Sequence, residues 1–125
     1  MDIVNDDRLL AAIYSACDVF AYPTLAENLP NGVLESMACG TPVVAFEVGG
    51  VPDAVRSHVT GQLASYRDVE DMAGKISHLL NNDEQRHMMS QKCREVATAE
   101  YGIELQATRY ESLYQEVSER ARTTR

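Results

Sequence analysis

Apolar residues are grouped in short, distinct segments over the first half of the chain. Residues 7–16 carry apolar side chains at helical spacing, which predicts an amphipathic helix. Residues 19–22 form a short continuous apolar run, typical of a buried strand. Residues 42–46 predict a second buried strand, and residues 61–65 predict a third, shorter one.

The segments between these runs have the residues expected of loops and helix ends. Residues 24–30 are polar or contain a proline, and we expect a loop there. Residues 31–39 predict a helix, with Asn31 as its N-cap and a glycine just past its end. Residues 48–55 predict a Gly-Gly turn leading into a short helix. Helices alternating with strands over short connections indicate an α/β fold with parallel strands.

The second half of the chain is predicted to be helical. We therefore expect a single partial domain over residues 1–125, with an α/β section at 1–66 and a helical section at 67–120. Two or three strands are few for a doubly wound sheet, so either the sheet is unusually small or part of it is absent from this chain. Three helical apolar faces are expected, marked by Val69, Met72, Ile76, Leu79 and Leu80; by Met89, Cys93, Val96 and Ala97; and by Tyr110, Leu113, Tyr114, Val117 and Ala121.

The charge of the chain narrows its possible partners. The 125 residues carry a net charge of -8, which is opposite in sign to that of a free-standing nucleic-acid binder. Residues 1–62 carry eight acidic residues but only two basic ones, Arg8 and Arg56. No apolar run approaches the ~20 residues that a membrane span needs, and no signal peptide is recognisable. We expect a cytoplasmic protein without a transmembrane segment.

The cysteines and histidines do not have metal-ligand spacing. Cys17, Cys39 and Cys93 form no C-x-x-C pair, and we expect reduced, mostly buried thiols. The three histidines are scattered and none is spaced to pair with a cysteine, so no structural zinc site is expected.

The segment 23–50 is the one whose residue types point to chemistry. Ligands of open α/β sheets bind beyond the carboxyl ends of the strands, and a helix N-terminus there attracts phosphate. Gly32 would let a phosphate approach the backbone closely. Carboxylates at Glu27 and Glu35 would repel a phosphate, but they could accept hydrogen bonds from hydroxyl groups on either side of it. A nucleotide-sugar has hydroxyls on both sides of its diphosphate.

At these residues the sequence resembles a known enzyme family. The string PTLAENLPNGVLESMACGTPVVA contains the E-x7-E motif, from Glu27 to Glu35, with glycines, prolines and apolar positions in register. It is similar to the retaining GT-B-fold glycosyltransferases that use nucleotide-sugar donors (glycosyl transferases group 1). The resemblance continues through VGGVPDAV and HVTGQL and covers residues 7–118. It implies a partial Rossmann-like parallel sheet of two or three strands, from the last part of the C-terminal, donor-binding domain.

The resemblance also implies roles for individual residues. Glu27 would be the catalytic position and would contact hydroxyls of the donor sugar, while Glu35 would accept hydrogen bonds from the ribose hydroxyls. Gly32 and Val33, at the start of the helix, would face the diphosphate. Backbone amides of the preceding loop would line the sugar and the diphosphate. The full implied set is Glu27, Asn28, Leu29, Pro30, Asn31, Gly32, Val33 and Glu35.

Two departures from the family pattern affect what we expect. Many relatives have Gly-Phe-Gly where this chain has Asn28-Leu29-Pro30, which obscures the identity of the sugar. Relatives also have an N-terminal acceptor domain and an Arg/Lys pair for the diphosphate, and neither is recognisable here. We therefore expect an isolated chain that transfers no sugar. Neither a cofactor nor a metal is expected, since cationic side chains and the helix N-terminus offset the charge of the leaving diphosphate in this family.

Alternative interpretations of these features stay open at this point. Glu27 and Glu35 could be two solvated acids near a helix start, where acids are favoured in any case. Gly49 and Gly50 are expected to make a tight turn, and the second interpretation is that they contact the donor loop, residues 24–30. The helical tail at 103–118 is most simply a packing helix, although an exposed apolar face is possible there.

A second functional interpretation is a non-catalytic module. A truncated parallel sheet would leave an open strand edge, and open edges recruit other strands. On that interpretation the chain would be a homo-oligomer assembled through its sheet edge. In the full enzyme, the protein could also be peripheral to a membrane.

Overall fold

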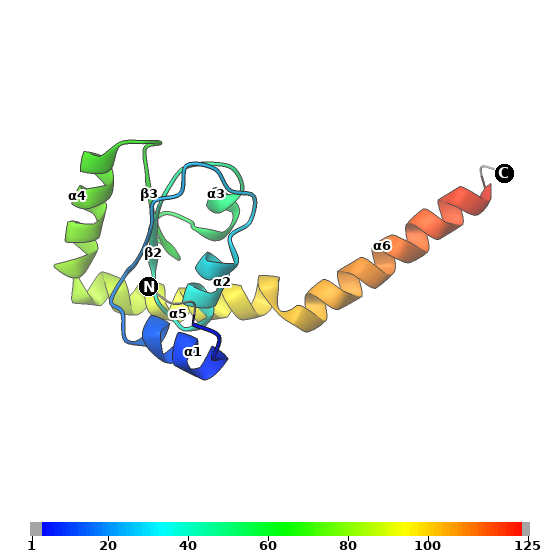
Figure 1. The fold of residues 1–125 in the computed structure, drawn as a ribbon, viewed down its shortest axis with the longest axis horizontal. Coiled ribbons are helices and arrows are strands. Elements are labelled where there is room, and N and C mark those ends of the chain that lie inside the picture. Colours follow the sequence, from blue (N-terminus) through cyan, green and yellow to red (C-terminus); the bar gives the residue numbers. More distant parts are fainter. Residues whose placement is uncertain (1–3, 124–125) are drawn as a thin grey trace.

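The computed structural model describes residues 4–123 and shows a three-stranded parallel sheet in the order β1-β2-β3 (Figure 1). The α/β prediction and the parallel strands are therefore confirmed. No described residue beyond β3 belongs to a strand, so the rest of the described chain is helical or irregular. The strands are β1 (Phe20–Tyr22), β2 (Val43–Phe46) and β3 (Gly61–Ala64).

The helices cover both faces of this sheet and continue past it. Apolar side chains of α2, α3 and α5 form one core cluster with β2, while α4 and α5 form a second cluster with β2 and β3. Asp6, Asp68 and Asn82 cap the N-termini of α1, α4 and α5 with their side chains. The helices are α1 (Asp7–Ser15), α2 (Asn31–Ala38), α3 (Val51–Ala54), α4 (Val69–Leu80), α5 (Asp83–Tyr101) and α6 (Ile103–Thr123).

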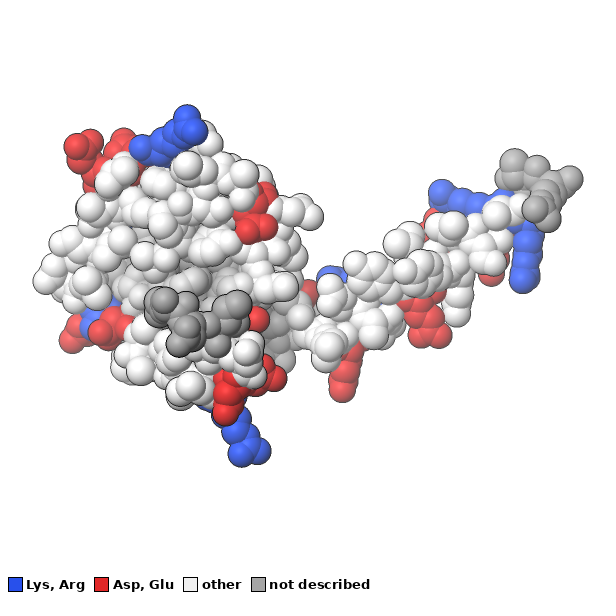
Figure 2. All heavy atoms as spheres, in the orientation of Figure 1, with Lys and Arg blue, Asp and Glu red and all other residues white. Residues whose placement is uncertain are grey.

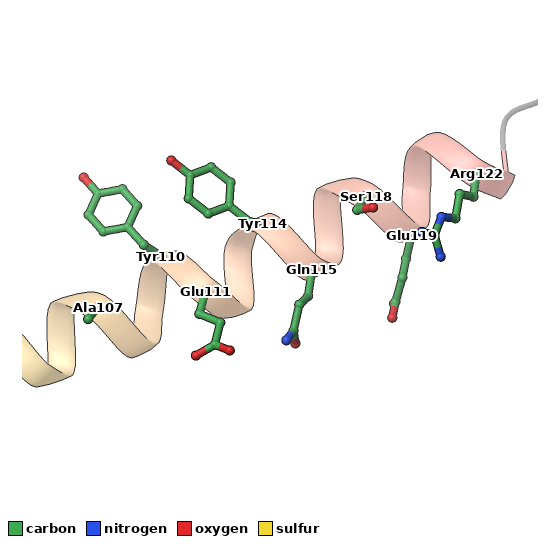
Figure 3. Close-up of a pocket in the computed structure, with 8 residues that line it drawn as sticks. All are labelled: Ala107, Tyr110, Glu111, Tyr114, Gln115, Ser118, Glu119 and Arg122. Carbon is green, nitrogen blue, oxygen red and sulfur yellow. The ribbon is translucent and has the colours of Figure 1, made fainter.

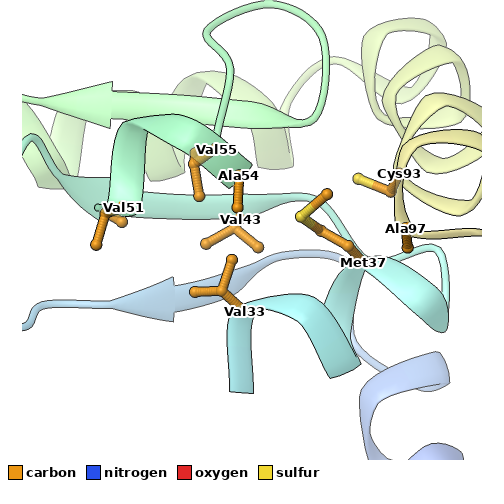
Figure 4. Close-up of a cluster of buried hydrophobic side chains, with 9 residues drawn as sticks. Val33, Met37, Val43, Val51, Ala54, Val55, Cys93 and Ala97 are labelled. Atoms are coloured by element: carbon orange, nitrogen blue, oxygen red, sulfur yellow. The ribbon is translucent and has the colours of Figure 1, made fainter. Parts of the chain in front are cut away.

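The central strand β2 explains why its sequence is apolar throughout. Val43 and Ala45 point into the first core cluster, and Val44 and Phe46 point into the second. All four residues are buried, as expected of a parallel strand covered by helices on both faces. Figure 4 shows Val43 among the side chains of the first cluster, which come from α2, from α3 and its C-cap Val55, and from α5: Val33, Met37, Val51, Ala54, Val55, Cys93 and Ala97.

The strand β1 differs from the buried strand predicted at residues 19–22. It lies at the edge of the sheet, Phe20 and Tyr22 are half-buried, and Ala21 is exposed. The apolar run gave no sign of this, because the sequence does not reveal how many strands lie beside it. The next helix also starts differently, since Pro30 rather than Asn31 is the N-cap of α2 and makes no side-chain capping hydrogen bond.

The cysteines are unpaired, but they are less buried than the sequence predicted. Cys93 is buried, its thiol donates to the carbonyl of Thr60 at 3.1 Å, and burial raises its pKa to about 12. Cys39 is half-buried and Cys17 is exposed. The expectation of mostly buried thiols is therefore wrong for Cys17, which lies just after the end of α1.

Helix α6 leaves the domain as a projecting rod, in orange and red in Figure 1. Gly102 separates it from α5, with an extended backbone at φ -59° and ψ 140°. No residue of α6 is buried, so the simpler expectation of a packing helix is wrong and the alternative of an exposed apolar face is confirmed. The exposed apolar side chains of α6 are Ile103, Tyr110, Leu113, Tyr114 and Val117.

The surface agrees with the acidic composition. On the face shown in Figure 2, acidic side chains are spread over the domain and α6, and the basic ones do not gather into a patch. Among residues 4–123, no helix is both long enough and apolar enough to cross a membrane.

Candidate functional site

The loop that follows the carboxyl end of β1 holds Glu27 in a fixed orientation. The hydroxyl of Tyr22, the last residue of β1, donates to Glu27 Oε2 at 2.7 Å. The backbone N–H of Asn28 donates to Glu27 Oε1 at 2.9 Å. Each carboxylate oxygen thus has one donor and retains further acceptor capacity. The half-buried Glu27 carboxylate can still accept hydrogen bonds from a ligand.

A second tyrosine contacts the other candidate carboxylate. Glu35 lies about one turn into α2 and is exposed, and the hydroxyl of Tyr14 from α1 donates to its Oε2 at 3.4 Å. A hollow of about 340 Å³ between α1 and α2 is lined by both of these residues. One carboxylate thus lies in the loop before α2 and the other within α2, and each is in contact with a tyrosine.

The surroundings of both tyrosines raise their pKa values. Burial, and then the charge of Glu35, raises the pKa of Tyr14. The hydrogen bond to Glu27, and then burial, raises the pKa of Tyr22. Both phenols are protonated at neutral pH, as tyrosines ordinarily are, and the raised pKa values extend this to more alkaline pH. The ring of Phe20 lies between them, with ring-centroid distances of 5.3 Å to Tyr14 and 5.8 Å to Tyr22.

The N-terminus of α2 lies between these two carboxylates in the sequence and has no side-chain cap. The first N–H groups of a helix have no partner within the helix, and they carry partial positive charge. Further into the first turn, the N–H groups of Val33 and Leu34 donate to the Pro30 carbonyl at 3.1 and 3.3 Å. A Cβ atom on Gly32 would lie 3.3 Å from the Tyr14 hydroxyl, so a side chain there would crowd this end of α2.

The Gly49-Gly50 turn packs directly against the Glu27 loop. Gly49 has a positive φ of 53°, and a Cβ atom on it would lie 1.8 Å from the Glu27 carbonyl oxygen. A Cβ atom on Gly50 would lie 1.9 Å from the Asn28 carbonyl oxygen. The N–H of Gly50 donates to the Glu27 carbonyl at 3.4 Å. The turn and the loop contact therefore occur together, because adjacent parallel strands end at the same edge of the sheet.

The remaining residues of the predicted set do not all face the same space. Pro30 and Val33 are buried, and the Val33 side chain belongs to the core. Leu29 and Asn31 are exposed and line a groove of about 460 Å³ together with Arg109 of α6. The fold thus brings a cation from the second half of the chain beside the acidic first half. The two halves of the chain differ in charge, but residues from both halves lie side by side in this groove.

Tyr14 and Tyr22 contact the site but do not belong to the set predicted from the sequence. Tyr22 could have been noticed, because it ends a strand directly before the loop. The contact between Tyr14 and Glu35 joins positions 21 apart in the sequence and depends on how α1 packs against α2. No local pattern reports that packing.

A separate hollow along α6, shown in Figure 3, does not belong to this site. Every residue that lines it lies on α6 itself, and none of them is in the predicted set. Tyr110 and Tyr114 stack there with ring centroids 6.2 Å apart. A surface formed by one helix is not an enclosed cavity.

Over residues 4–123, no group of three or more His, Cys, Asp or Glu side chains is arranged to hold a metal ion.

Solved glycosyltransferase structures share this fold. Sucrose-phosphate synthase from Thermosynechococcus elongatus matches with a TM-score of 0.83 and 32% identity, over 87% of this chain and 27% of that chain. HepE from Anabaena, in complex with UDP-glucose, matches with a TM-score of 0.77 and 22% identity, over 85% of this chain and 30% of that chain. The fold is that of the C-terminal domain of GT-B glycosyltransferases.

The sequence comparison then identifies the family. Residues 4–96 match the pattern of the glycosyl transferases group 1, and the chain belongs to this family. D-inositol 3-phosphate glycosyltransferase from Mycobacterium tuberculosis is 46% identical to it over 71 residues, which are 57% of this chain and 15% of that protein. The chain therefore spans only a small part of the length of the relatives that it matches.

The close contact at Gly49 generates a prediction. We expect Gly49→Ala to destabilise the fold by about 1–3 kcal/mol, because φ is positive and a Cβ atom has no room beside the Glu27 carbonyl. Gly74→Ala is the matched control, since Gly74 lies within α4 with nothing within 4 Å, and it should stabilise by about 0.5–1 kcal/mol. Urea unfolding measures both changes. Equal stability of the two variants would contradict the packing of the turn against the loop.

Proposed function

We propose that this chain is the donor-binding section of a retaining glycosyltransferase, which transfers a sugar from a nucleotide-sugar to a glycan or lipid-linked acceptor. One observation carries the proposal. Glu27 and Glu35 flank an uncapped helix N-terminus in the sequence, and each carboxylate accepts a hydrogen bond from a tyrosine of a different element. A solvated pair of acids would not need this arrangement.

The chemistry of a nucleotide-sugar suits these groups. Its diphosphate would lie against the N–H groups at the start of α2, which the helix dipole makes favourable for an anion. Hydroxyls of the sugar would donate to Glu27, and hydroxyls of the ribose would donate to Glu35. The UDP-glucose bound to HepE, a protein of the same fold, supports this class of ligand. Asn28, Leu29, Pro30 and Asn31 would line the donor through the loop backbone.

In this proposal Glu27 is the catalytic position, where it orients the sugar as its bond to the diphosphate breaks. The helix N-terminus offsets the charge that develops on the leaving diphosphate. Residues 1–66 carry the donor site, and residues 67–120 support it. The nucleotide-sugar is a substrate, and no resident metal or other cofactor is required. The proposal places the protein in the cytoplasm, where three unpaired cysteines remain reduced.

Donor binding is tested by titrating the chain with UDP-glucose, a GDP-sugar and an ADP-sugar in the presence of EDTA. We expect one of them to bind at millimolar affinity or tighter, with amide shifts concentrated at residues 31–35 and 27–28. Glu27→Gln should weaken binding about tenfold, because it removes a charged acceptor. Glu70→Gln, on the exposed face of α4, is the control and should leave the affinity unchanged. Silent spectra with all three donors, or binding that EDTA abolishes, would count against the proposal.

The isolated chain is expected to bind donor without turning it over. Among the described residues that line the groove with Leu29 and Asn31, Arg109 is the only basic one. A helix dipole gives limited stabilisation to a leaving diphosphate in water. The rate of UDP release from UDP-glucose, measured with a coupled assay, should equal the rate measured without protein. A rate clearly above that background would show that this chain alone is catalytic.

A second candidate function is self-association through the edge of β1. Within the described part of the chain, β1 pairs on one side only, with β2. The N–H of Phe20 donates to Pro42 in that pair at 2.9 Å, so the N–H of the next residue, Ala21, points to the open side. Ala21 is also exposed. This edge can accept another strand, which would make the chain an assembly module rather than a donor-binding section.

Ala21→Pro separates the two functions. Proline removes the outward N–H without removing a bond to β2, and an edge strand tolerates it there. If the chain assembles through this edge, light scattering will show an oligomer for the unchanged protein and a monomer for Ala21→Pro. A monomer in both cases would refute assembly, and an oligomer in both would place the contact elsewhere. Titrating the unchanged protein and Ala21→Pro with UDP-glucose then shows whether the oligomeric state changes the affinity for the donor.

A further inference from the structure

The end of α5 holds the short helix α3 in place. The guanidinium of Arg56, two residues past α3, forms a paired contact with the Glu100 carboxylate, with distances of 2.9 Å from Nη1 to Oε1 and 2.5 Å from Nη2 to Oε2. This hydrogen-bonded pair raises the pKa of Arg56 and lowers that of Glu100. The neighbouring Tyr101 donates its hydroxyl to the carbonyl of Asp53, within α3, at 3.0 Å.

Helix α3 depends on these contacts because it is only four residues long. A helix of this length is not stable by itself, and its last carbonyl groups have no partner within the helix. Here the Asp53 carbonyl accepts from both Tyr101 and Arg56, the latter at 3.3 Å. Val51 and Ala54 are fully buried and fix the core side of the helix. The α5 contacts fix its outer side.

The position of α3 in turn sets the position of the donor loop. Gly50 is the N-cap of α3, and its N–H donates to the Glu27 carbonyl. The same α5 residues reach the loop by a second route, because Glu100 and Tyr101 line the groove that also contains Leu29 and Asn31. The end of α5 thus borders the donor loop directly and supports it through α3.

We propose that Glu100 and Tyr101 are positioning residues, which hold the Gly49-Gly50 turn against the loop that carries Glu27. Neither residue belongs to the E-x7-E segment, and neither touches the Glu27 carboxylate. Their effect on a donor rests on the proposed function. Their effect on the turn does not, so the two can be tested apart.

Hydrogen exchange at the Gly50 amide tests the turn without any ligand. We expect Glu100→Gln to accelerate this exchange about fivefold, because the charged pair that steadies α3 is lost. Tyr101→Phe removes a single hydroxyl, and we expect it to act in the same direction. The amide of Phe20, which donates to the Pro42 carbonyl between β1 and β2, is the internal reference and should keep its exchange rate. A purely structural role would accelerate both amides together.

Glu95→Gln is the matched control. Glu95 also lies on α5 and also forms an ion pair, at 2.5 Å with Lys92, but that pair joins two residues of the same helix. It should leave the Gly50 amide unchanged. Unchanged Gly50 exchange in both Glu100→Gln and Tyr101→Phe would overturn the proposal. So would equal acceleration in Glu95→Gln.

Titration with UDP-glucose then separates the two proposals. If the unchanged chain binds UDP-glucose, Glu100→Gln should raise the dissociation constant several-fold while Glu95→Gln does not. Unchanged affinity together with altered Gly50 exchange would overturn the step from turn to donor. If Gly50 exchange responds as expected but the unchanged chain binds none of the three donors, the positioning of the turn stands and the proposed function fails.

Discussion

The candidate site depends on the close approach of two backbone segments. The carbonyl groups of Glu27 and Asn28 lie where Cβ atoms of Gly49 and Gly50 would otherwise be. Parallel pairing of β1 with β2 brings the ends of both strands to one edge of the sheet, and the two following loops must share the space beyond it. Glycine is the residue that allows them to do so. The loop that carries Glu27 and the start of α3 meet at this contact.

The sequence predicted the parts of the fold that rest on local patterns. The apolar run at β2 and the helical spacing of α5 report burial directly, and α4 also lies where it was expected, although Val69 and Leu80 of its predicted apolar face are exposed. The half-exposed β1 and the projecting α6 were not foreseen in that form, because their exposure depends on what lies beside them. The type of an apolar residue does not show whether another element covers it in the structure.

The candidate site shows the same division. The carboxylates, the loop and the helix start were recognisable because they form one continuous motif. Tyr14, Glu100 and Tyr101 reach the site from α1 and α5, through contacts between distant positions. Arg109 is the clearest case, because it lies 78 positions after Asn31 in the sequence. Its position beside Asn31 follows only from the course of α6.

The projecting helix α6 has a mechanical consequence. Its 21 residues, at 1.5 Å of rise each, make a rod about 30 Å long. Gly102 joins it to α5, next to Glu100 and Tyr101, which line a groove together with Leu29 and Asn31. Arg109 also attaches α6 to the end of α5, because its guanidinium donates to the Glu100 carbonyl at 3.2 Å. A force applied to the far end of α6 would therefore act on the end of α5, beside the groove that Leu29 and Asn31 also line.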